Sequence, residues 1–270
     1  KPGYSRSDNA IDEKEDVIIL NKLSEDLGVL RQSMLYSLAE VAHHNINRKQ
    51  SDLKLFEFGK TYRKKSEGYK ECNRLALLMT GNILSEHWLN KTQKVAFHDL
   101  YGAVKALVSQ FTSKPLATDV KHGHPYDYSL ELSVNSKVLA SVGKVSPSAL
   151  KEIGIRQEVF FADIDWDLLL SINSSKITYA EVSKFPEVRR DLSLVIDKSV
   201  SFDQIKNLAL KKERKLLQSI NVFDVYEGNK IGADQKAYAM SFILQDRDKT
   251  LTDKVIDKTM SKLMSGFESE

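Results

Sequence analysis

The C-terminal third of the chain carries five periodic segments in an order that few folds accommodate. Three of them alternate apolar and polar residues as half-buried strands do, and two have the 3.6-residue spacing of amphipathic helices. They form a strand, a helix, two strands and a helix, at residues 190–197, 201–209, 216–226, 237–245 and 252–267. One further strand would complete the ferredoxin-like βαββαβ sandwich. The sequence therefore predicts this sandwich with its last strand missing.

Residues at the ends of these segments agree with the predicted order. Ser201 precedes the first helix, and Gln204 follows three residues later, which is the spacing of a capping box. Thr252 has the position and the hydroxyl of a cap for the second helix. A loop with two glycines, EGNKIGADQK, joins the second and third strands. Local signals and segment order thus predict the same fold.

The upstream part of the chain predicts a second domain, in which antiparallel strands mix with helices. Helical spacing marks residues 32–47, 98–111 and 146–154. Strand patterns occur at residues 17–20, 53–62, 74–81, 126–134, 137–145 and 158–165. Two of these strands flank Asn135 and Ser136 and are expected to form a hairpin. The polar residues 171–176 have no period, so we expect the domains to span residues 1–176 and 177–270.

The composition is that of a globular protein of about two domains. Of 270 residues, 41% are hydrophobic and 29% are charged, and the net charge is only +3, so bulk charge does not favour nucleic acid. The single cysteine, Cys72, excludes an internal disulfide and favours a reducing cytosol. No apolar run reaches the roughly 18 residues of a membrane span, and no signal peptide opens the chain. Because the first residue is Lys1, we expect a piece of a longer protein.

Several motifs, in order along the chain, resemble those of a known family. KFPEVRRDLSLVID, VFDVYEG and QDRDKTLTD resemble the ferredoxin-fold anticodon-binding domain of bacterial phenylalanine–tRNA ligase β subunits. Upstream, LNKLSEDLGVLRQSMLYSLAEVAHHNINR, LFEFGKTY and GKVSPSALKEIGI resemble the synthetase-like core domain of that subunit. The resemblance covers nearly the whole chain and implies its C-terminal portion. It also implies an α+β fold, with a class II synthetase-like antiparallel sheet domain before the ferredoxin-like sandwich.

The chain departs from the family's pattern at three positions. Lys22 and Tyr36 stand where we expect the proline-rich segments of the family, which weakens the resemblance at these local turns. Ala237 stands where we expect a serine, so a hydroxyl that could contact a base is absent. These departures leave the assignment unchanged.

The upstream domain is expected to lack catalytic residues. A class II synthetase needs cationic clamps on ATP and a metal held by carboxylates, because phosphate charge develops during activation of the amino acid. The corresponding strand, LFEFG, has Phe56 and Phe58 where the class has an Arg-x-Glu pattern, and no glycine-rich strand ending in arginine follows. We therefore predict no catalytic residue, no metal ligand and no cofactor in this piece. For the complete ligase, the resemblance implies ATP and Mg²⁺.

The resemblance also implies partners and a compartment. Residues 1–176 would support assembly with the catalytic α subunit in an α2β2 heterotetramer, while the complete cytoplasmic enzyme attaches phenylalanine to its tRNA. The helix from about Gln32 to Asn47 resembles the long interface helix of the class, and the alternative is an ordinary core helix. No membrane partner is expected.

One strand of the sandwich carries the sharpest candidates for RNA binding. Alternation in NVFDVYEG places Asp224 and Tyr226 on one face and Phe223 and Val225 on the other. We expect the apolar pair to pack on the helices and the polar pair to lie on the open face. The Tyr226 ring can stack on an unpaired base, and the Asp224 carboxylate can accept hydrogen bonds from guanine. The resemblance implies that these positions contact the first anticodon base, a guanine.

Basic residues supply the other candidate RNA contacts. Arg189 and Arg190 precede Asp191 at a strand start, so we expect Asp191 to anchor one arginine while the other points toward RNA phosphate. The alternative is a charged entrance to the strand. The resemblance adds Lys236, in DQKAYAM, and Arg247, in QDRDKTLTD.

Two further features and a rival function stay open. The basic residues within 211–215 end a helix, where they are either a solvated face or contacts to RNA phosphate. His122 and His124 could begin a metal site, but zinc needs three or four ligands, so a solvated loop is favoured. Finally, a βαββα unit can bind a small regulatory molecule at a subunit interface, which is the alternative to RNA binding.

Overall fold

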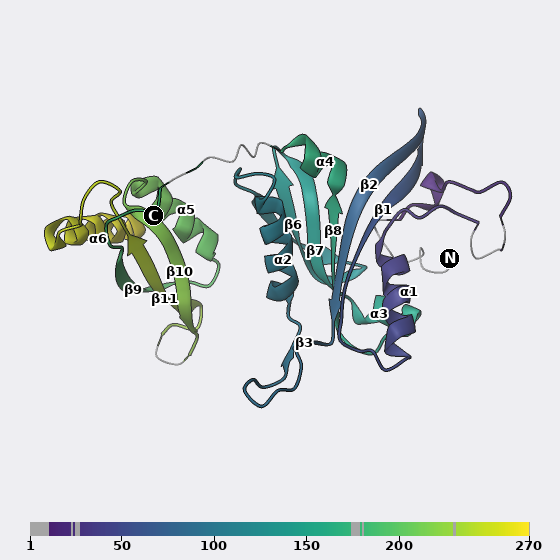
Figure 1. Cartoon of the computed structure of the whole chain (residues 1–270), viewed down its shortest axis with the longest axis horizontal. Helices are drawn as coiled ribbons and strands as arrows, with labels where there is room; N and C mark the ends of the chain where they lie inside the picture. Colours follow the sequence, from purple (N-terminus) through teal and green to yellow (C-terminus); the bar gives the residue numbers. More distant parts are fainter. Residues whose placement is uncertain are drawn as a thin grey trace. The chain divides into compact units, whose positions relative to one another are not determined.

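The computed structural model describes most of the chain, namely residues 11–22, 24, 28–173, 179, 181–228 and 231–269. The chain divides into two compact units, residues 1–177 and 178–270, which we call unit 1 and unit 2. The domain boundary expected from the sequence lies outside the described residues. Both units combine antiparallel strands with helices (Figure 1), and the predicted α+β class is confirmed.

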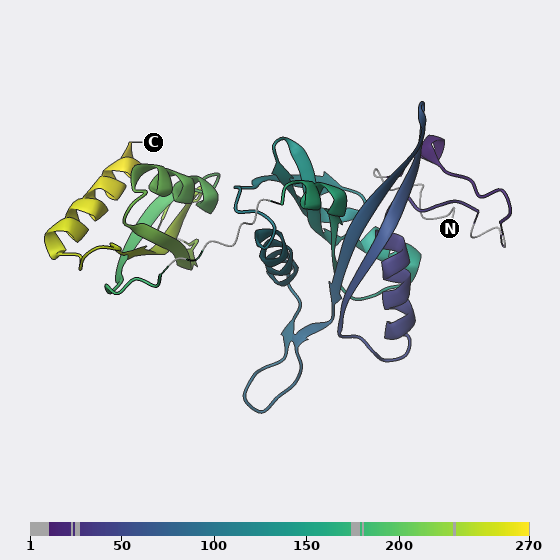
Figure 2. The same cartoon turned by 45° about the horizontal axis from the view of Figure 1, so that its top comes forward.

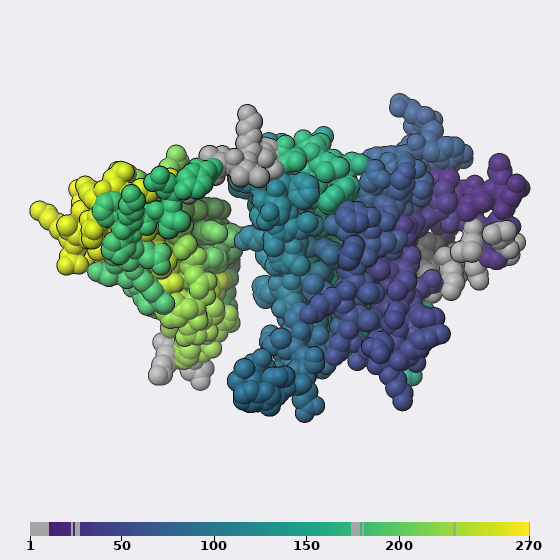
Figure 3. All heavy atoms as spheres, in the orientation of Figure 1, coloured from purple at the N-terminus to yellow at the C-terminus, as the bar shows by residue number. Residues whose placement is uncertain are grey.

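Unit 1 is built on a six-stranded antiparallel sheet with the strand order β1-β2-β8-β7-β6-β5. Its strands are β1 (Leu53–Lys65), β2 (Gly68–Thr80), β5 (Ala117–Gly123), β6 (Tyr126–Val134), β7 (Lys137–Val145) and β8 (Val159–Asp165). A separate two-stranded ribbon consists of β3 (Asn82–Leu84) and β4 (Gln93–Lys94). The loop of this ribbon stands away from the rest of unit 1 (Figures 1 and 3).

Helices cover both faces of this sheet, and each face has its own apolar core (Figure 2). The helices of unit 1 are η1 (Glu13–Glu15), α1 (Leu35–Ile46), α2 (Phe97–Ser109), α3 (Pro147–Ile153) and α4 (Trp166–Ser171). Phe161 packs in the core with α1 and α3, whereas its neighbour Phe160 packs in the core with α2 and α4. Successive side chains of a strand point to opposite faces, so one strand supplies both cores.

Most predicted elements of unit 1 are present, and the signals at their ends are borne out. The Ser146 hydroxyl accepts a hydrogen bond from the Ala149 amide at the start of α3. Gly154 ends that helix with φ of +90°, a conformation that favours glycine. Asn135 and Ser136 both have positive φ, as a two-residue hairpin turn requires.

The structure departs from the predicted elements of unit 1 at residues 17–20 and at β5, and it adds α4 and the β3–β4 ribbon, which were not predicted. Residues 17–20 form no strand: a single bridge joins Ile18 to Val29, and Ile18 is 72% exposed. The apolar run there has no neighbouring strands to bury it. Conversely, the edge strand β5 went unpredicted, because its residues are all exposed and show no apolar alternation.

Unit 2 has a three-stranded antiparallel sheet with the order β10-β11-β9. Its elements are β9 (Val188–Asp197), α5 (Phe202–Lys212), β10 (Leu217–Tyr226), β11 (Gln235–Leu244) and α6 (Asp253–Glu268). The predicted βαββα order is confirmed, and the fourth strand of the sandwich is absent from the described residues. None of the helices in the described parts of the chain combines the length and hydrophobicity that a membrane span requires.

One face of the unit 2 sheet packs against α5 and α6. Met240, Phe242 and Leu244 of the central strand β11 are fully buried in this core. At the start of α5, Ser201 and Gln204 bond reciprocally as the predicted capping box. Thr252 does precede α6, but its side chain makes no capping hydrogen bond.

Candidate nucleic-acid interface

The candidate site is the face of the unit 2 sheet that points away from α5 and α6, which we call the open face. Strand register identifies its residues, because residues opposite each other on antiparallel strands share a face. They are Arg189, Asp191, Ser193, Val195 and Asp197 on β9, Gln235, Ala237, Ala239, Ser241 and Ile243 on β11, and Ser219, Asn221, Phe223, Asp224 and Tyr226 on β10.

The central strand contributes only small side chains to the middle of the open face. Ala237 lies between Tyr226 and Val195, and Ala239 lies between Asp224 and Ser193. Rings and charges therefore stand on the two outer strands. A flat group such as a nucleobase can approach the backbone of β11 closely while it contacts side chains on either side.

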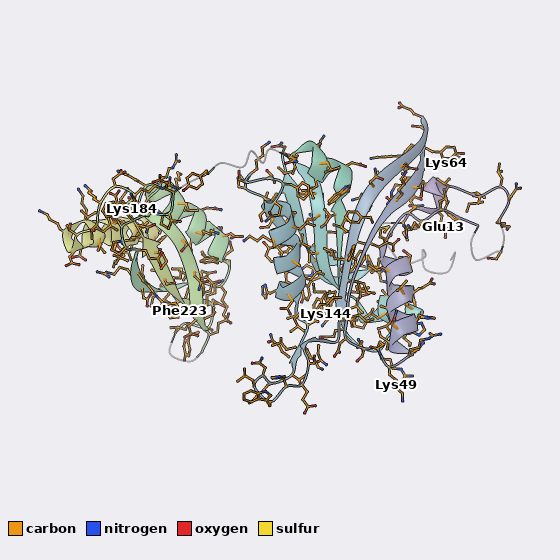
Figure 4. All side chains as sticks on the ribbon, in the orientation of Figure 1. Glu13, Lys49, Lys64, Lys144, Lys184 and Phe223 are labelled. Carbon is orange, nitrogen blue, oxygen red and sulfur yellow. The ribbon has the colours of Figure 1, made fainter. Side chains whose placement is uncertain are left out.

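A β-bulge at Phe223 changes the face predicted for this residue. Val222 pairs with Met240 and Asp224 with Ala239, so Phe223 is the extra residue that interrupts the alternation. Its ring is 51% exposed, and the guanidinium carbon of Arg189 lies 5.2 Å from the ring centre. The prediction that Phe223 packs on the helices was wrong, and the ring (labelled in Figure 4) belongs to the open face.

Val225 departs from the prediction for a different reason. It pairs with Tyr238, whose side chain lies on the helix side of the sheet, yet Val225 is half exposed. It is not part of the apolar core formed with α5 and α6. The helices therefore leave this end of β10 uncovered, and the expected burial of Val225 was wrong.

The two neighbouring arginines of β9 lie on opposite faces of the sheet. Arg189 is on the open face, where its Nε and Nη2 donate to the Asp191 carboxylate at 2.8 and 3.3 Å. Arg190 lies on the helix side, where Nη2 is 3.7 Å from the Asp253 carboxylate in the first turn of α6. Asp191 thus anchors Arg189 on the open face. Arg190, the other arginine, lies on the opposite face beside Asp253.

Asp224 and Tyr226 occupy the face that alternation predicted for them, opposite Ala239 and Ala237. Asp224 is exposed, and within the described residues its carboxylate has no hydrogen bond or ion pair. The Tyr226 ring lies close to Gly228, where an added Cβ would come within 2.6 Å of the phenol oxygen. Glycine at that position leaves room for the ring. The predicted role of both side chains in RNA binding stays a prediction.

Lys236 and Arg247, the two other candidates, do not lie with this pair. Lys236 pairs with Ile196 on the helix side, and its buried ammonium donates to the Lys198 carbonyl at 2.8 Å. Lys236 also lies over the Tyr238 ring, so it acts as a structural contact. Arg247 is exposed in the loop between β11 and α6, at the end of β11 remote from Tyr226.

The remaining candidate features form no site around the open face. The basic residues within 211–215 surround Glu213, which accepts hydrogen bonds from Lys262 and from two backbone amides. No group of three His, Cys, Asp or Glu side chains in the described part of the chain is placed to hold a metal. The open face itself presents two exposed rings, of Phe223 and Tyr226, and the carboxylate of Asp224.

Two family models match the chain, and together they span most of it. The model described as phenylalanyl tRNA synthetase beta chain CLM domain matches residues 4–166. The ferredoxin-fold anticodon binding domain matches residues 183–270, which include the whole open face. Both matches support the ligase interpretation, and neither supports the small-molecule module.

Curated relatives named phenylalanine–tRNA ligase beta subunit agree with these two family models. The phenylalanine–tRNA ligase beta subunits of Bacteroides fragilis and Bacteroides thetaiotaomicron are 39% and 41% identical over 270 and 272 residues. These alignments cover 95% and 94% of this chain and 33% of each relative. The subunit from Fusobacterium nucleatum is 35% identical over 259 residues, 93% of this chain and 32% of the relative. The chain spans about a third of the length of the curated relatives it matches.

Similarity to solved structures is weaker. A pyrrolysyl-tRNA synthetase from Desulfitobacterium hafniense has a TM-score of 0.44 and 16% identity, covering 61% of this chain and 58% of that chain. That likeness is too distant to carry an argument. The family model over residues 4–166 alone covers more than half of the chain. The chain therefore belongs to the family of the phenylalanyl tRNA synthetase beta chain CLM domain, here followed by a ferredoxin-fold anticodon binding domain.

Proposed function

We propose that this chain is the part of a phenylalanine–tRNA ligase that recognises the anticodon region of phenylalanine tRNA. The observation that carries the proposal is the open face itself. It presents an unpaired carboxylate, two exposed rings and a strip of small residues, within a region that matches an anticodon-binding family. Sequence-specific RNA recognition commonly uses such surfaces, because unstacked bases expose both their rings and their hydrogen-bonding edges.

Asp224 and Tyr226 are suited to reading a guanine. The Watson–Crick edge of guanine donates from its ring N–H and its amino group, and an ionised carboxylate only accepts hydrogen bonds. Tyr226, two residues further along the strand, offers a ring on which the same base can stack. We assign this base to the first anticodon position.

Phe223 and Arg189 offer a second surface beside this pair. The bulge brings the Phe223 ring next to Asp224, and Asp191 holds the Arg189 guanidinium over that ring. Both planar groups can stack on a base. An adjoining nucleotide of a single-stranded loop can therefore be held here while Arg189 faces its phosphate.

The proposed role of unit 1 is assembly with the catalytic α subunit of an α2β2 enzyme in the cytoplasm. On β1, Phe56 and Phe58 expose uncharged rings where the class has a charged pattern, and the lysines on the same face, Lys54 and Lys60, bond to the Ile83 carbonyl and to Glu71. We place the ATP and Mg²⁺ needed for aminoacylation on the α subunit. This chain then contributes scaffold and RNA recognition, and its own catalytic activity is expected to be absent.

The proposal is tested in the complete ligase, with tRNA carrying the native anticodon and with tRNA changed at its first anticodon base. Stacking contributes about 1–3 kcal/mol per base, so Tyr226→Ala should weaken tRNA binding by roughly tenfold or more. Asp224→Asn should mainly reduce the preference for guanine, since an amide also donates. The measurement is kcat/KM for each tRNA together with its dissociation constant.

Two controls separate recognition from folding. Tyr226→Phe keeps the ring and should retain most of the affinity. Asp257→Asn makes the same charge change as Asp224→Asn on the exposed surface of α6 and should keep full discrimination. If the wild type does not distinguish the two tRNAs, or both Tyr226→Ala and Asp224→Asn keep full discrimination, the open face does not recognise the anticodon.

A further inference from the structure

The β1–β2 hairpin of unit 1 carries a cationic hollow, remote in sequence from the open face. Strand register places Thr61 opposite Cys72 and Arg63 opposite Lys70. Lys65 and Arg74 lie two residues further along β1 and β2, on the same face. These six side chains line a hollow of about 370 Å³. Ala76 and Leu78, which follow on the same face of β2, belong to the core with α1 and α3, so the hollow lies on that face, toward the hairpin turn after Lys65.

The hollow has an excess of positive charge. Four cationic side chains line it, against two carboxylates that come from the segment around η1, Asp12 and Glu15. The Asp12 carboxylate is already engaged, because it accepts the Lys14 amide at the start of η1. Glu15 bonds to both Arg63 and Lys65, which lowers the pKa of its carboxyl group. Glu15 therefore stays ionised, occupies both cations and offsets one of their two charges.

The two other cations have unused donors. The guanidinium of Arg74 is 3.9 Å from its nearest carboxylate oxygen, on Asp165, which is too long for a hydrogen bond. Its Nε is buried and has no hydrogen-bond partner in the part of the chain that the structure describes. Lys70 is exposed, and within the described residues it has no ion pair. The Arg74 side chain is 27% exposed, so its terminal nitrogens can meet an acceptor in the hollow, whereas the buried Nε cannot.

We propose that this hollow binds a phosphate group, carried either by a free polyphosphate such as pyrophosphate or a nucleotide, or by an RNA backbone. Phosphate oxygens only accept hydrogen bonds, and they match the planar fork of Arg74 and the mobile ammonium of Lys70. Glu15 competes with the ligand, since it is an anion already bound inside the same hollow. This site lies in unit 1, so the proposal does not depend on the anticodon role of unit 2.

Cys72 provides a direct readout, because it lines the hollow and is the only cysteine of the chain. The rate at which iodoacetamide, a neutral reagent, alkylates Cys72 can be followed by mass spectrometry of the intact chain. Added pyrophosphate or octauridylate should slow this alkylation at least severalfold. Protection by pyrophosphate identifies a free polyphosphate as a ligand, and protection by octauridylate alone identifies an RNA backbone. The proposal is wrong if pyrophosphate and octauridylate both fail to protect Cys72 and both show no binding in calorimetry.

Substitutions of opposite expected sign sharpen the test. Lys70→Ala should weaken binding of the protecting probe by about tenfold, as expected for the loss of a charge-assisted hydrogen bond. Glu15→Gln should tighten it by roughly threefold or more, because the competing anion is removed. Lys64→Ala and Glu13→Gln are the matched controls (both residues are labelled in Figure 4), and neither residue lines the hollow.

The control variants distinguish binding inside the hollow from attraction by the general positive charge of the hairpin. Unchanged affinity in Lys64→Ala and Glu13→Gln, with opposite changes in Lys70→Ala and Glu15→Gln, supports the hollow. Equal losses in Lys64→Ala and Lys70→Ala would show that only the general charge of the hairpin attracts the probe, and the proposal would fail. Circular dichroism of each variant checks that it remains folded.

Discussion

The two sheets of this protein differ in how many of their faces the helices cover. In unit 1, Phe160 and Phe161 are neighbours on β8 and both are buried, because separate cores lie on the two faces. In unit 2, Leu192 of β9 packs in the core with the helices while its neighbour Ser193 is exposed on the open face. Where helices cover both faces, as they do around β8, few polar side chains are left for a ligand; in unit 1 these gather at the uncovered end of the β1–β2 hairpin. The uncovered face of unit 2 is therefore where recognition chemistry can gather.

The prediction with the largest expected change in the free energy of unfolding uses two phenylalanines on opposite faces of the unit 2 sheet. Phe242 is fully buried against the helices, and Phe223 is half exposed on the open face. We expect Phe242→Ala to lower the free energy of unfolding by about 3–5 kcal/mol, because it leaves a cavity. Phe223→Ala should cost less than about 1 kcal/mol. Hydrogen exchange of β11 amides measures both effects, and equal losses would show that Phe223 belongs to the core.

The second test uses the Asp163 carboxylate of unit 1, whose Oδ1 lacks a hydrogen-bond partner among the described residues. Burial raises the pKa of Asp163 above its usual 3.8, more than the nearby Arg74 lowers it. The ionised form is thus disfavoured in the folded state. Asp163→Asn should raise the free energy of unfolding by about 1–2 kcal/mol at neutral pH.

The pH dependence of this effect has a definite sign. Because the folded-state pKa of Asp163 is raised, its destabilising effect is full above that pKa, shrinks as the pH falls below it, and is gone below the unfolded value of about 3.8. The advantage of Asp163→Asn should shrink in urea titrations repeated at decreasing pH. A variant that is less stable at neutral pH would show that the ionised carboxylate has a favourable partner.

Glu213 in unit 2 is the opposite case, a half-buried carboxylate whose partners are present. Burial raises its pKa, but hydrogen bonds from Lys262 and from the Leu216 and Lys215 amides outweigh burial, so the pKa is lowered. We expect Glu213→Gln to cost about 1 kcal/mol at neutral pH.

For Glu213 the stabilising effect is present above the unfolded pKa of about 4.5 and is lost as the pH falls through the lower folded value. Urea titrations of wild type and Glu213→Gln should therefore differ at pH 7 and converge below that window. A difference that persists in acid would mean that the loss comes from packing. A Lys262→Met variant should reproduce part of the loss.

Much of the fold followed from the sequence, whereas the detail of the candidate site did not. The capping box at Ser201 and the left-handed Gly154 were predictable because their signals are local. The bulge at Phe223 was not, since it depends on how β10 aligns with β11, and no residue type specifies it. The burial of Lys236 was also unpredictable, because its acceptor is the carbonyl of Lys198, 38 residues away.

The smallest expected effect concerns Arg189 and Arg190, and it tests which face meets RNA. Both side chains are largely exposed, so neither Arg189→Gln nor Arg190→Gln should shift the melting temperature by more than about 2 °C. Arg189→Gln should nevertheless weaken RNA binding about equally for all sequences and reduce the slope of log affinity against log salt by roughly one. Arg190→Gln should leave both unchanged, because Arg190 lies on the helix side beside Asp253.

Filter binding of phenylalanine tRNA at several salt concentrations measures the affinity and the slope together. Asp191→Asn is a control with the opposite expected effect, because it releases Arg189 from its carboxylate partner. RNA affinity should rise, while the slope of log affinity against log salt should stay the same or become steeper. A larger loss in Arg190→Gln than in Arg189→Gln would place RNA on the helix side of the sheet. In that case the exposed rings of Phe223 and Tyr226 would need a different partner, since they lie on the face that Arg189 shares.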